Sequence, residues 1–383
     1  MLKYSLLIEM GMFEMGSRVF KFIKREPVFL ASLICAGVSM LLVPPDAAYS
    51  GYINTEVLCL LFCFMLVQAG MQSCGLLDFL AGKLLRGPKN LRTLTLLLVL
   101  LTFFLSMFIT NDVALIALVP FTILILGRAG KKRSLIFTIV LQTAAANLGS
   151  MLTPFGNPQN LFLYSDFELS FADFITVLLP FAAVSLVMLC AACLFVRKEP
   201  LEPLSASAAA APVRCRKRLF LFLLCILCVL HVFPYWVLTP IVAGFFLFVS
   251  RPSFRAVDYG LLCTFVCFFI FSGNMGRIPA VQSLIGEWLN ADPFGTSVLA
   301  SQVISNVPAA VLLSGFTDNA PALLAGTNVG GLGTIIASLA SVISFRLYMR
   351  TENARAGRYL GVFTLVNAAG LAVLCGLYYL PGR

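Results

Sequence analysis

A polar triplet, Thr110-Asn111-Asp112, interrupts the apolar stretch FFLSMFITNDVALIALVPF, about 17 residues from basic clusters on both sides. A carboxylate this far inside an apolar segment is costly and marks a functional site by default. Such an acid can carry a proton or bind Na⁺, or can simply pair with a helix N-terminus. Thr110 or Asn111 would cap the second arm of a helical hairpin, whose free N–H groups attract an anion.

A second Ser/Thr-Asn pair, Ser305-Asn306, lies in ISNVPA, which matches ITNDVA at 109–114. The following Val307-Pro308 fits a helix start, because proline is tolerated in the first turn. The two pairs predict two hairpin tips. A tight turn between complete spans remains open for the first pair, and an ordinary helix start remains open for the second.

Two further stretches cannot continue a helix. The segment 147–160 carries Asn147, Gly149 and then TPFGNPQN, in which prolines and glycines break helical bonding. The segment 327–334, TNVGGLGT, matches ANLGSMLT at 146–153. Irregular backbone within a membrane is tolerated only where it is buried in protein or lines a cavity. Each break can offer carbonyls to a cation and a new helix start to an anion.

The composition indicates which kind of secondary structure positions these residues. Of 383 residues, 60 % are hydrophobic and 11 % are charged, whereas soluble domains carry about 25 % charged residues. This excludes a soluble enzyme, a disordered scaffold and a disulfide-stapled module. An all-α polytopic membrane protein of roughly nine to eleven membrane segments fits the length. The twelve cysteines include two CxxC pairs inside apolar runs, which indicate helix contacts rather than a zinc site.

The net charge of +10 comes from short basic clusters between the apolar runs, which predicts cytoplasmic loops and not nucleic-acid binding. The N-terminus is then cytoplasmic. The predicted domains are a cytoplasmic segment 1–27, a first repeat 28–196 with hairpin 93–127 and broken helix 134–165, a cytoplasmic linker 197–218, and a second repeat 219–383 with hairpin 280–317 and broken helix 320–345.

The loop charges place the open ends of the two hairpins on opposite sides of the membrane. Matched motifs in the same order with opposite sidedness are typical of inverted-topology repeats in secondary transporters. The sequence leaves open whether 93–127 is re-entrant or forms two full spans. Lone Arg277, near the outer face, is expected to reach the membrane interface.

These motifs resemble the ion transporter superfamily, which includes divalent anion–sodium symporters, citrate transporters and arsenite permeases. The resemblance rests on the two Ser/Thr-Asn tips, on GNPQN at 156–160 and on 328–334; it covers the layout of nearly the whole chain but only about 35 residues in motif. It implies re-entrant hairpins, an elevator mechanism and a homodimer. Symporter tips commonly read Ser-Asn-Thr, whereas Asp112 and Val307 stand here. Asp112 looks more like the arsenite permeases, and GNPQN resembles an uncharacterised permease branch.

We therefore expect a multi-pass secondary transporter of the inner membrane, not an enzyme, that moves a small anion, organic or inorganic, with H⁺ or Na⁺. No cofactor and no metal beyond Na⁺ are expected; the lipid bilayer and a second copy of the chain are the expected partners. A Na⁺/H⁺ antiporter, with Asp112 as the exchanging acid, and an arsenite permease are the alternatives. The predicted substrate-binding residues are Thr110, Asn111, Asn157, Pro158, Asn160, Ser305, Asn306, Gly331 and Thr334, and the predicted coupling-ion residues are Asp112, Asn147, Gly149, Asn328 and Gly330.

Overall fold

The computed structural model describes residues 27–75, 90–128, 130–131, 134–201, 215–352 and 354–380. Within these ranges the chain is helical and forms no strand, apart from one isolated bridge between Asn90 and Pro200. Residues 1–26 of the expected N-terminal segment and 202–214 of the expected linker lie outside the described residues. The remaining end of that linker, from Arg216, already belongs to a helix.

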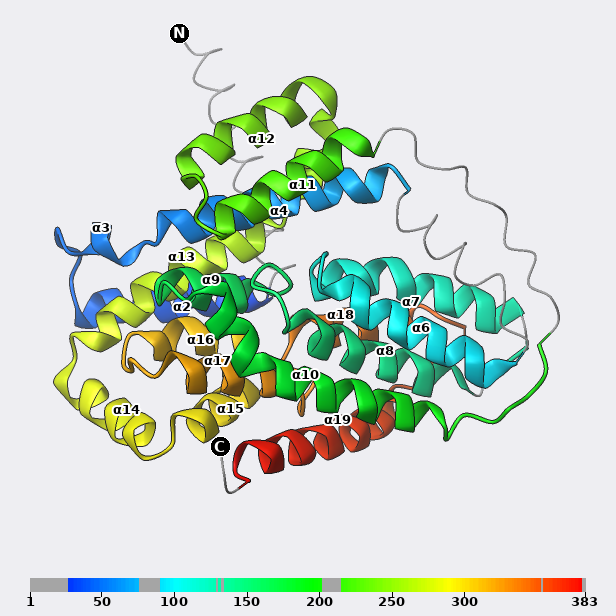
Figure 1. Cartoon of the computed structure of the whole chain (residues 1–383). Coiled ribbons are helices and arrows are strands. Elements are labelled where there is room, and N and C mark those ends of the chain that lie inside the picture. Colours follow the sequence, from blue (N-terminus) through cyan, green and yellow to red (C-terminus); the bar gives the residue numbers. More distant parts are fainter. Residues whose placement is uncertain are drawn as a thin grey trace, which may run out of the picture.

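The helices follow one another as shown in Figure 1. In chain order they are α2 (Pro27–Leu42), α3 (Tyr49–Tyr52), α4 (Thr55–Ser73), α6 (Leu91–Ser106), α7 (Asn111–Arg128), α8 (Leu135–Ser150), α9 (Pro158–Asp166), α10 (Phe171–Cys193), α11 (Arg216–Val229), α12 (Tyr235–Val249), the 3₁₀ helix η2 (Arg251–Ala256), α13 (Tyr259–Gly276), α14 (Pro279–Ala291), α15 (Pro293–Ile304), α16 (Asn306–Ser314), α17 (Ala320–Val329), α18 (Leu339–Met349) and α19 (Ala356–Tyr378).

Four of the described helices, α4, α10, α13 and α19, are long and apolar enough to cross a membrane. Six others are apolar but shorter, among them both arms of the first hairpin. Large apolar side chains such as Val187 on α10 and Leu365 on α19 are exposed, at 69 % and 72 %. An exposed apolar surface on long helices is what a membrane-embedded protein presents to its surroundings. The fold is therefore an all-helical, multi-helix membrane protein.

The first hairpin consists of α6 and α7, which meet at residues 107–110. Asn90 caps α6 by accepting a hydrogen bond from the Thr93 amide at 3.0 Å. The 16 residues of α6 rise about 24 Å, which is less than the roughly 30 Å of a bilayer core. Asn111 at the tip is only 5 % exposed, so the end of the hairpin is enclosed by protein.

The second hairpin is shorter than the predicted range 280–317. That range contains three helices, because Asp292 caps a new helix through the Gly295 amide at 2.9 Å and Pro293 occupies its first turn. The helix α14 is thus separate from the hairpin, which consists of α15 and α16. Trp288 on α14 is 57 % exposed. Sequence inspection missed α14 because its apolar residues run on into α15 without a basic cluster between them.

Both predicted helix breaks appear as interruptions between two packed helices. The first runs from Met151 to Asn157, between α8 and α9, and the second from Gly330 to Ser338, between α17 and α18. The predicted ranges 147–160 and 327–334 were wrong at their ends, because 147–150 and 327–329 still form the last turns of α8 and α17, and Pro158 is tolerated in the first turn of α9. Gly149 brings α8 close to α6, since a Cβ there would strike the Phe103 carbonyl oxygen and lie 2.7 Å from Ser106 Oγ. Gly330 brings α17 equally close to α15, with Ser301 Oγ 2.8 Å from such a Cβ.

The helices of the two hairpins and breaks also contact one another across the halves of the chain. α7 of the first hairpin packs against α18, and α16 of the second hairpin packs against α9. α8 lies against α6, α7, α18 and α19. A second group forms around α4, with α11 and α12 on one side, visible at the top of Figure 1. The helix α13 packs most extensively against α2.

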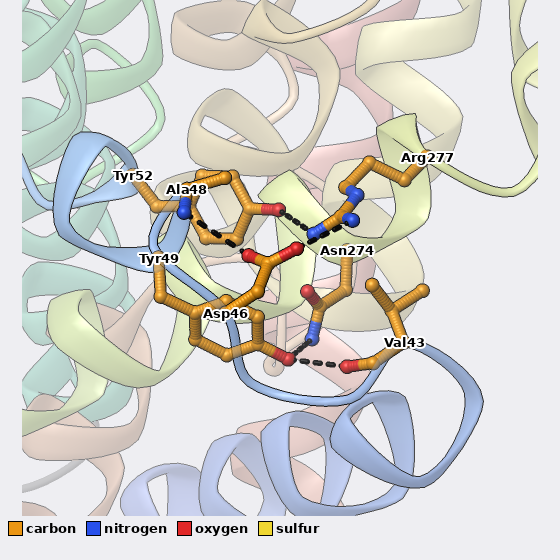
Figure 2. A network of polar contacts seen from close by, with 7 residues as sticks. All are labelled: Val43, Asp46, Ala48, Tyr49, Tyr52, Asn274 and Arg277. Atoms are coloured by element: carbon orange, nitrogen blue, oxygen red, sulfur yellow. Dashed lines mark hydrogen bonds and ion pairs between the residues drawn. The ribbon is translucent and has the colours of Figure 1, made fainter.

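A polar network joins the loop after α2 to the end of α13 (Figure 2). Arg277 donates to Asp46 Oδ2 at 2.7 Å and to the Tyr52 hydroxyl at 3.2 Å. Asn274 donates to the Tyr49 hydroxyl at 2.9 Å. The Arg277 guanidinium lowers the pKa of the Asp46 carboxyl below its ordinary value. The side chain of Arg277 thus has a defined protein partner in addition to its position at the end of a span.

Candidate functional site

The tip of the first hairpin contacts the first helix break. The Asn111 backbone amide donates to the Gly156 carbonyl at 3.3 Å, and its side-chain Nδ2 donates to Asn147 Oδ1 at 3.0 Å. Thr110 Oγ1 lies 3.4 Å from Gln68 Oε1 on α4. The structure therefore brings together the predicted residues Thr110 and Asn111, at the hairpin tip, and Asn147 of α8.

The tip of the second hairpin makes the matching contact. The Asn306 amide donates to the Ala337 carbonyl at 3.0 Å, and the Ser305 hydroxyl donates to the same oxygen at 3.3 Å. Asn111 and Asn306 occupy the same place in the two tip motifs, and Gly156 and Ala337 both precede the start of the second half-helix by two residues. Each hairpin tip thus donates its amide to the backbone of its own break.

Asn147 connects the two breaks. Its Oδ1 accepts from Asn111 and also from the Ser338 hydroxyl at 3.0 Å, at the start of α18. Its Nδ2 lies 3.4 Å from the Gly331 carbonyl in the second break. A single buried amide therefore bonds to the first hairpin and to both ends of the second break. Ser338 was not among the predicted residues, although it follows the second break as Asn157 follows the first.

Asn160 bonds to backbone carbonyls that lose their helical partners at the first break. Its Nδ2 lies 3.3–3.4 Å from the carbonyl oxygens of Ser150, Met151 and Thr153. Its Oδ1 accepts from Asn328 Nδ2 at 2.6 Å. Asn160 is completely buried. Its side chain bonds the first break and also links that break to α17.

Gln302, which sequence inspection missed, plays the comparable part in the second break. Its Nε2 donates to the carbonyls of Gly330 and Leu332 at 2.8 and 2.9 Å, and its Oε1 accepts from the Thr334 amide at 2.8 Å. The Thr334 hydroxyl donates to the Gln302 carbonyl at 3.1 Å. The one signal in the sequence was an amide side chain three residues before Ser305, in an arm whose other polar residues are small hydroxyls.

A cavity of about 220 Å³ opens beside the first hairpin tip. Four predicted residues line it, namely Thr110, Asp112, Asn157 and Pro158. Three further polar residues in its wall were not predicted, namely Gln68 and Gln72 on α4 and Asp258 before α13. Asp258 could be found only as the one acid between the basic cluster of η2 and an apolar span, where it reads as a simple N-cap. The predicted residues that do not line this cavity are Asn111, Asn147, Gly149, Asn160, Ser305, Asn306, Asn328, Gly330, Gly331 and Thr334.

The polar atoms of this cavity are not saturated by the protein. Oδ1 of Asp112, Nε2 of Gln68 and Oδ1 of Asn157 are shielded from solvent and have no hydrogen-bond partner in the described part of the chain. Among the lining residues that the structure describes there are two carboxylates and no Lys, Arg or His. The cavity therefore favours a cation or a neutral polar molecule, and an anion would need a cation beside it.

Residues 19–342 match the family model CitMHS, described as citrate transporter. The chain belongs to this family. The match covers both hairpins and both helix breaks up to the first residues of α18. It confirms the resemblance to the ion transporter superfamily that the hairpin-tip and GNPQN motifs indicated.

Individual relatives agree with this membership. The chain is 32 % identical over 334 residues to Inner membrane protein YbiR of Escherichia coli K12, covering 83 % of this chain and 87 % of that protein. It is 31 % identical over 319 residues to Uncharacterized transporter MJ0456 of Methanocaldococcus jannaschii, covering 82 % and 86 %. It is 31 % identical over 155 residues to Silicon efflux transporter LSI3 of rice, covering 40 % and 31 %. The chain is thus a membrane transporter of the citrate transporter family.

Proposed function

We propose that this protein is a secondary active transporter that moves a small anion, an organic acid or an inorganic oxyanion, together with H⁺ or Na⁺. The observation that carries the proposal is the cavity that places Asp112 beside the start of α9 at Asn157 and Pro158. The free N–H groups of a helix start attract the anion, and the buried carboxylate requires a cation. Because the charged groups in the cavity wall are both carboxylates, an anion is not favoured there without a cation beside it, which couples anion binding to cation binding.

Two inverted repeats and an elevator motion extend this proposal. In support, both hairpin tips donate their amides to matching carbonyls, at Gly156 and Ala337. The hairpins and broken helices interleave across the two halves, whereas α11 and α12 pack chiefly against α4 and each other. We assign the first set to a transport body and the second set, with α2 and α13, to a scaffold that pairs with a second copy in the bilayer. The E. coli relative, named an inner membrane protein, supports an inner-membrane location. The cytoplasmic N-terminus is proposed from the basic clusters of the sequence alone.

The two carboxylates in the cavity also favour a second candidate, exchange of Na⁺ for H⁺ without an anion. A third, transport of an uncharged oxyacid of the arsenite type, draws support from the rice relative, which is named for silicon efflux, because silicic and arsenious acids are both neutral at pH 7. Both alternatives avoid placing an anion beside Asp112 and Asp258.

Uptake into proteoliposomes separates the three. The panel contains carboxylates, sulfate, phosphate, arsenite and silicic acid, offered under imposed H⁺ or Na⁺ gradients. If the protein is a coupled anion transporter, the wild type accumulates one of the anions when the ion gradient is imposed. In Asp112→Asn the ion gradient no longer drives this accumulation. If Na⁺ exchanges for H⁺ and no anion moves, the protein is an antiporter. If arsenite or silicic acid alone is taken up, the protein is a carrier of neutral oxyacids.

The site assignment has its own test. Asn111→Ala and Asn306→Ala each remove a tip side chain, and we expect each to lower transport by at least about tenfold, which corresponds to about 1.4 kcal/mol. Asn290→Ala, at an exposed position on α14, is the matched control. Transport by both tip variants at the control rate would show that the tips are not the site.

A further inference from the structure

Asp258 shares the cavity with Asp112 but lies on a different wall and at a different depth. Asp112 belongs to the first turn of α7, and its Oδ1 is shielded from solvent. Asp258 immediately precedes α13 and is exposed. Asp258 therefore lies at the mouth of the cavity and Asp112 lies inside it.

Capping α13 uses only part of the Asp258 carboxylate. Oδ1 accepts from the Leu261 amide at 2.8 Å, and among the described residues no hydrogen bond is formed by Oδ2. A helix N-cap is satisfied equally well by Asn or Ser. The negative charge of Asp258 is thus not required by its capping role, and one oxygen is available to a ligand.

Two buried amides point to the kind of ligand. Gln68 and Asn157 are each 2 % exposed, line the same cavity, and carry Nε2 and Oδ1 atoms, respectively, that lack a partner in the part of the chain the structure describes. A buried polar atom without a partner costs about 1–3 kcal/mol, so such atoms mark a place where a ligand completes the bonding. The Asn157 Oδ1 atom, the Thr110 hydroxyl and the two carboxylates are oxygen ligands of the kind that hard cations prefer. Gln68 Nε2 is instead a hydrogen-bond donor, which can bond an acceptor beside the cation, such as a water ligand.

The charges around the cavity favour a cation at this place. Among the lining residues within the described ranges, Asp112 and Asp258 are the titratable groups. Arg251 and Arg255 of the adjoining η2 are exposed and do not line the cavity. Arg218 of α11 packs against Gly70 of α4 but donates to Cys74 Sγ at 3.0 Å and does not line the cavity either. Two carboxylates that face one small cavity repel each other unless a proton or a metal cation lies between them.

We propose that Asp258 is the second carboxylate of a monovalent-cation site, which receives Na⁺ or H⁺ at the cavity mouth and holds it together with Asp112. This rests on the proposed function, in which Asp112 carries the coupling ion. A cation shared by the two residues joins the tip of the first hairpin to the start of α13. A bound cation thereby holds the first hairpin against α13, which we assign to the scaffold. Release of the cation removes this link between the hairpin and α13.

The first test measures cation binding without transport. The purified full chain is titrated with NaCl against choline chloride at constant ionic strength, and the melting temperature and proton release into a weakly buffered solution are recorded. We expect a Na⁺-dependent rise in melting temperature with proton release in the wild type, absent in Asp112→Asn. In Asp258→Asn the apparent Na⁺ affinity falls by about tenfold, or 1.4 kcal/mol.

Asp292→Asn is the matched control, because Asp292 also caps a helix through the amide three residues on, at 2.9 Å, but does not line the cavity. If H⁺ is the ion, Na⁺ has no effect and Asp258→Asn instead shifts the pH profile of uptake relative to Asp292→Asn. The proposal is overturned if Asp258→Asn and Asp292→Asn have the same Na⁺ affinity and the same pH profile. Cation binding without any driven anion uptake would retain this site and reject coupled anion transport.

Discussion

Asn328 donates a 2.6 Å hydrogen bond from Nδ2 to Oδ1 of Asn160, and this bond joins the last turn of α17 to the first turn of α9. Asn160 in turn approaches the carbonyls that the first break frees. Both side chains are buried, at 0 % and 2 % exposure. One amide pair thus holds together two helix fragments from different halves of the chain, which couples the geometry of one break to that of the other.

Replacing Asn160 by Ala should destabilise the protein by about 1–3 kcal/mol, because Asn328 and three carbonyls lose a buried partner. The measurement is the melting temperature of the purified protein in detergent. Asn290→Ala, on the exposed surface of α14, serves as the control. Equal melting temperatures for the two variants would mean that water replaces the Asn160 amide without cost.

Replacing Gln302 by Ala should loosen the second break, because the Gly330 and Leu332 carbonyls and the Thr334 amide lose their side-chain partner. Hydrogen exchange followed by mass spectrometry should show faster exchange over residues 330–337, with protection of α15 itself retained. Gln282→Ala, exposed on α14, should leave the exchange of 330–337 unchanged. Unaltered exchange in Gln302→Ala would show that the backbone of the break holds its shape without that amide.

The positions of the hairpin tips and breaks could be predicted because each places polar, Gly or Pro residues inside an apolar run, and few structures accept that pattern. Thr110-Asn111 lies just where α6 and α7 meet, and 151–157 separates α8 from α9. The starts of α4, α10 and α13 fall within one or two residues of the apolar runs, because Asn54, Ser170 and Asp258 cap them.

The partners of these residues could not be predicted. Gln302 and Gln68 lie in largely apolar helices, and only the packing of distant helices shows that one bonds a break and the other lines a cavity. The second function of Asp258 is hidden for a related reason, since an acid before an apolar helix is fully explained as a cap. α14 was missed because apolar periodicity does not mark the boundary at Asp292.

Replacing Gly149 by Ala should destabilise the packing of α8 on α6. A Cβ at this position meets the Phe103 carbonyl and Ser106 Oγ, and backbone cannot move aside cheaply, so we expect a loss of about 1–3 kcal/mol. Gly244→Ala in α12 is the control, because nothing lies within 4 Å of its added Cβ. Its melting temperature should stay level or rise, since Ala favours a helix by up to about 1 kcal/mol. A tolerated Gly149→Ala would show that the two helices can separate.

The ion pair between Asp46 and Arg277 should give a pH dependence of its own. Because Arg277 lowers the pKa of Asp46 in the folded protein, the pair contributes stability above the unfolded pKa of Asp46, and this contribution is lost as the pH falls through the lowered folded value. We therefore expect the melting temperatures of wild type and Asp46→Asn to differ at pH 7 and to converge in strong acid. Glu287→Gln, an exposed change on α14, should follow the wild type throughout.

A difference in melting temperature between wild type and Asp46→Asn that stays constant at all pH values would contradict this account. The effect of the substitution would then come from altered packing and not from the lost charge. Arg277→Gln separates the two further. It removes the charge that lowers the pKa of Asp46, so the convergence should move to higher pH in a comparison of Arg277→Gln with the double variant. Because Arg277 lies at the end of α13 opposite Asp258, a change in cation affinity in Arg277→Gln would show that α13 transmits strain between its two ends.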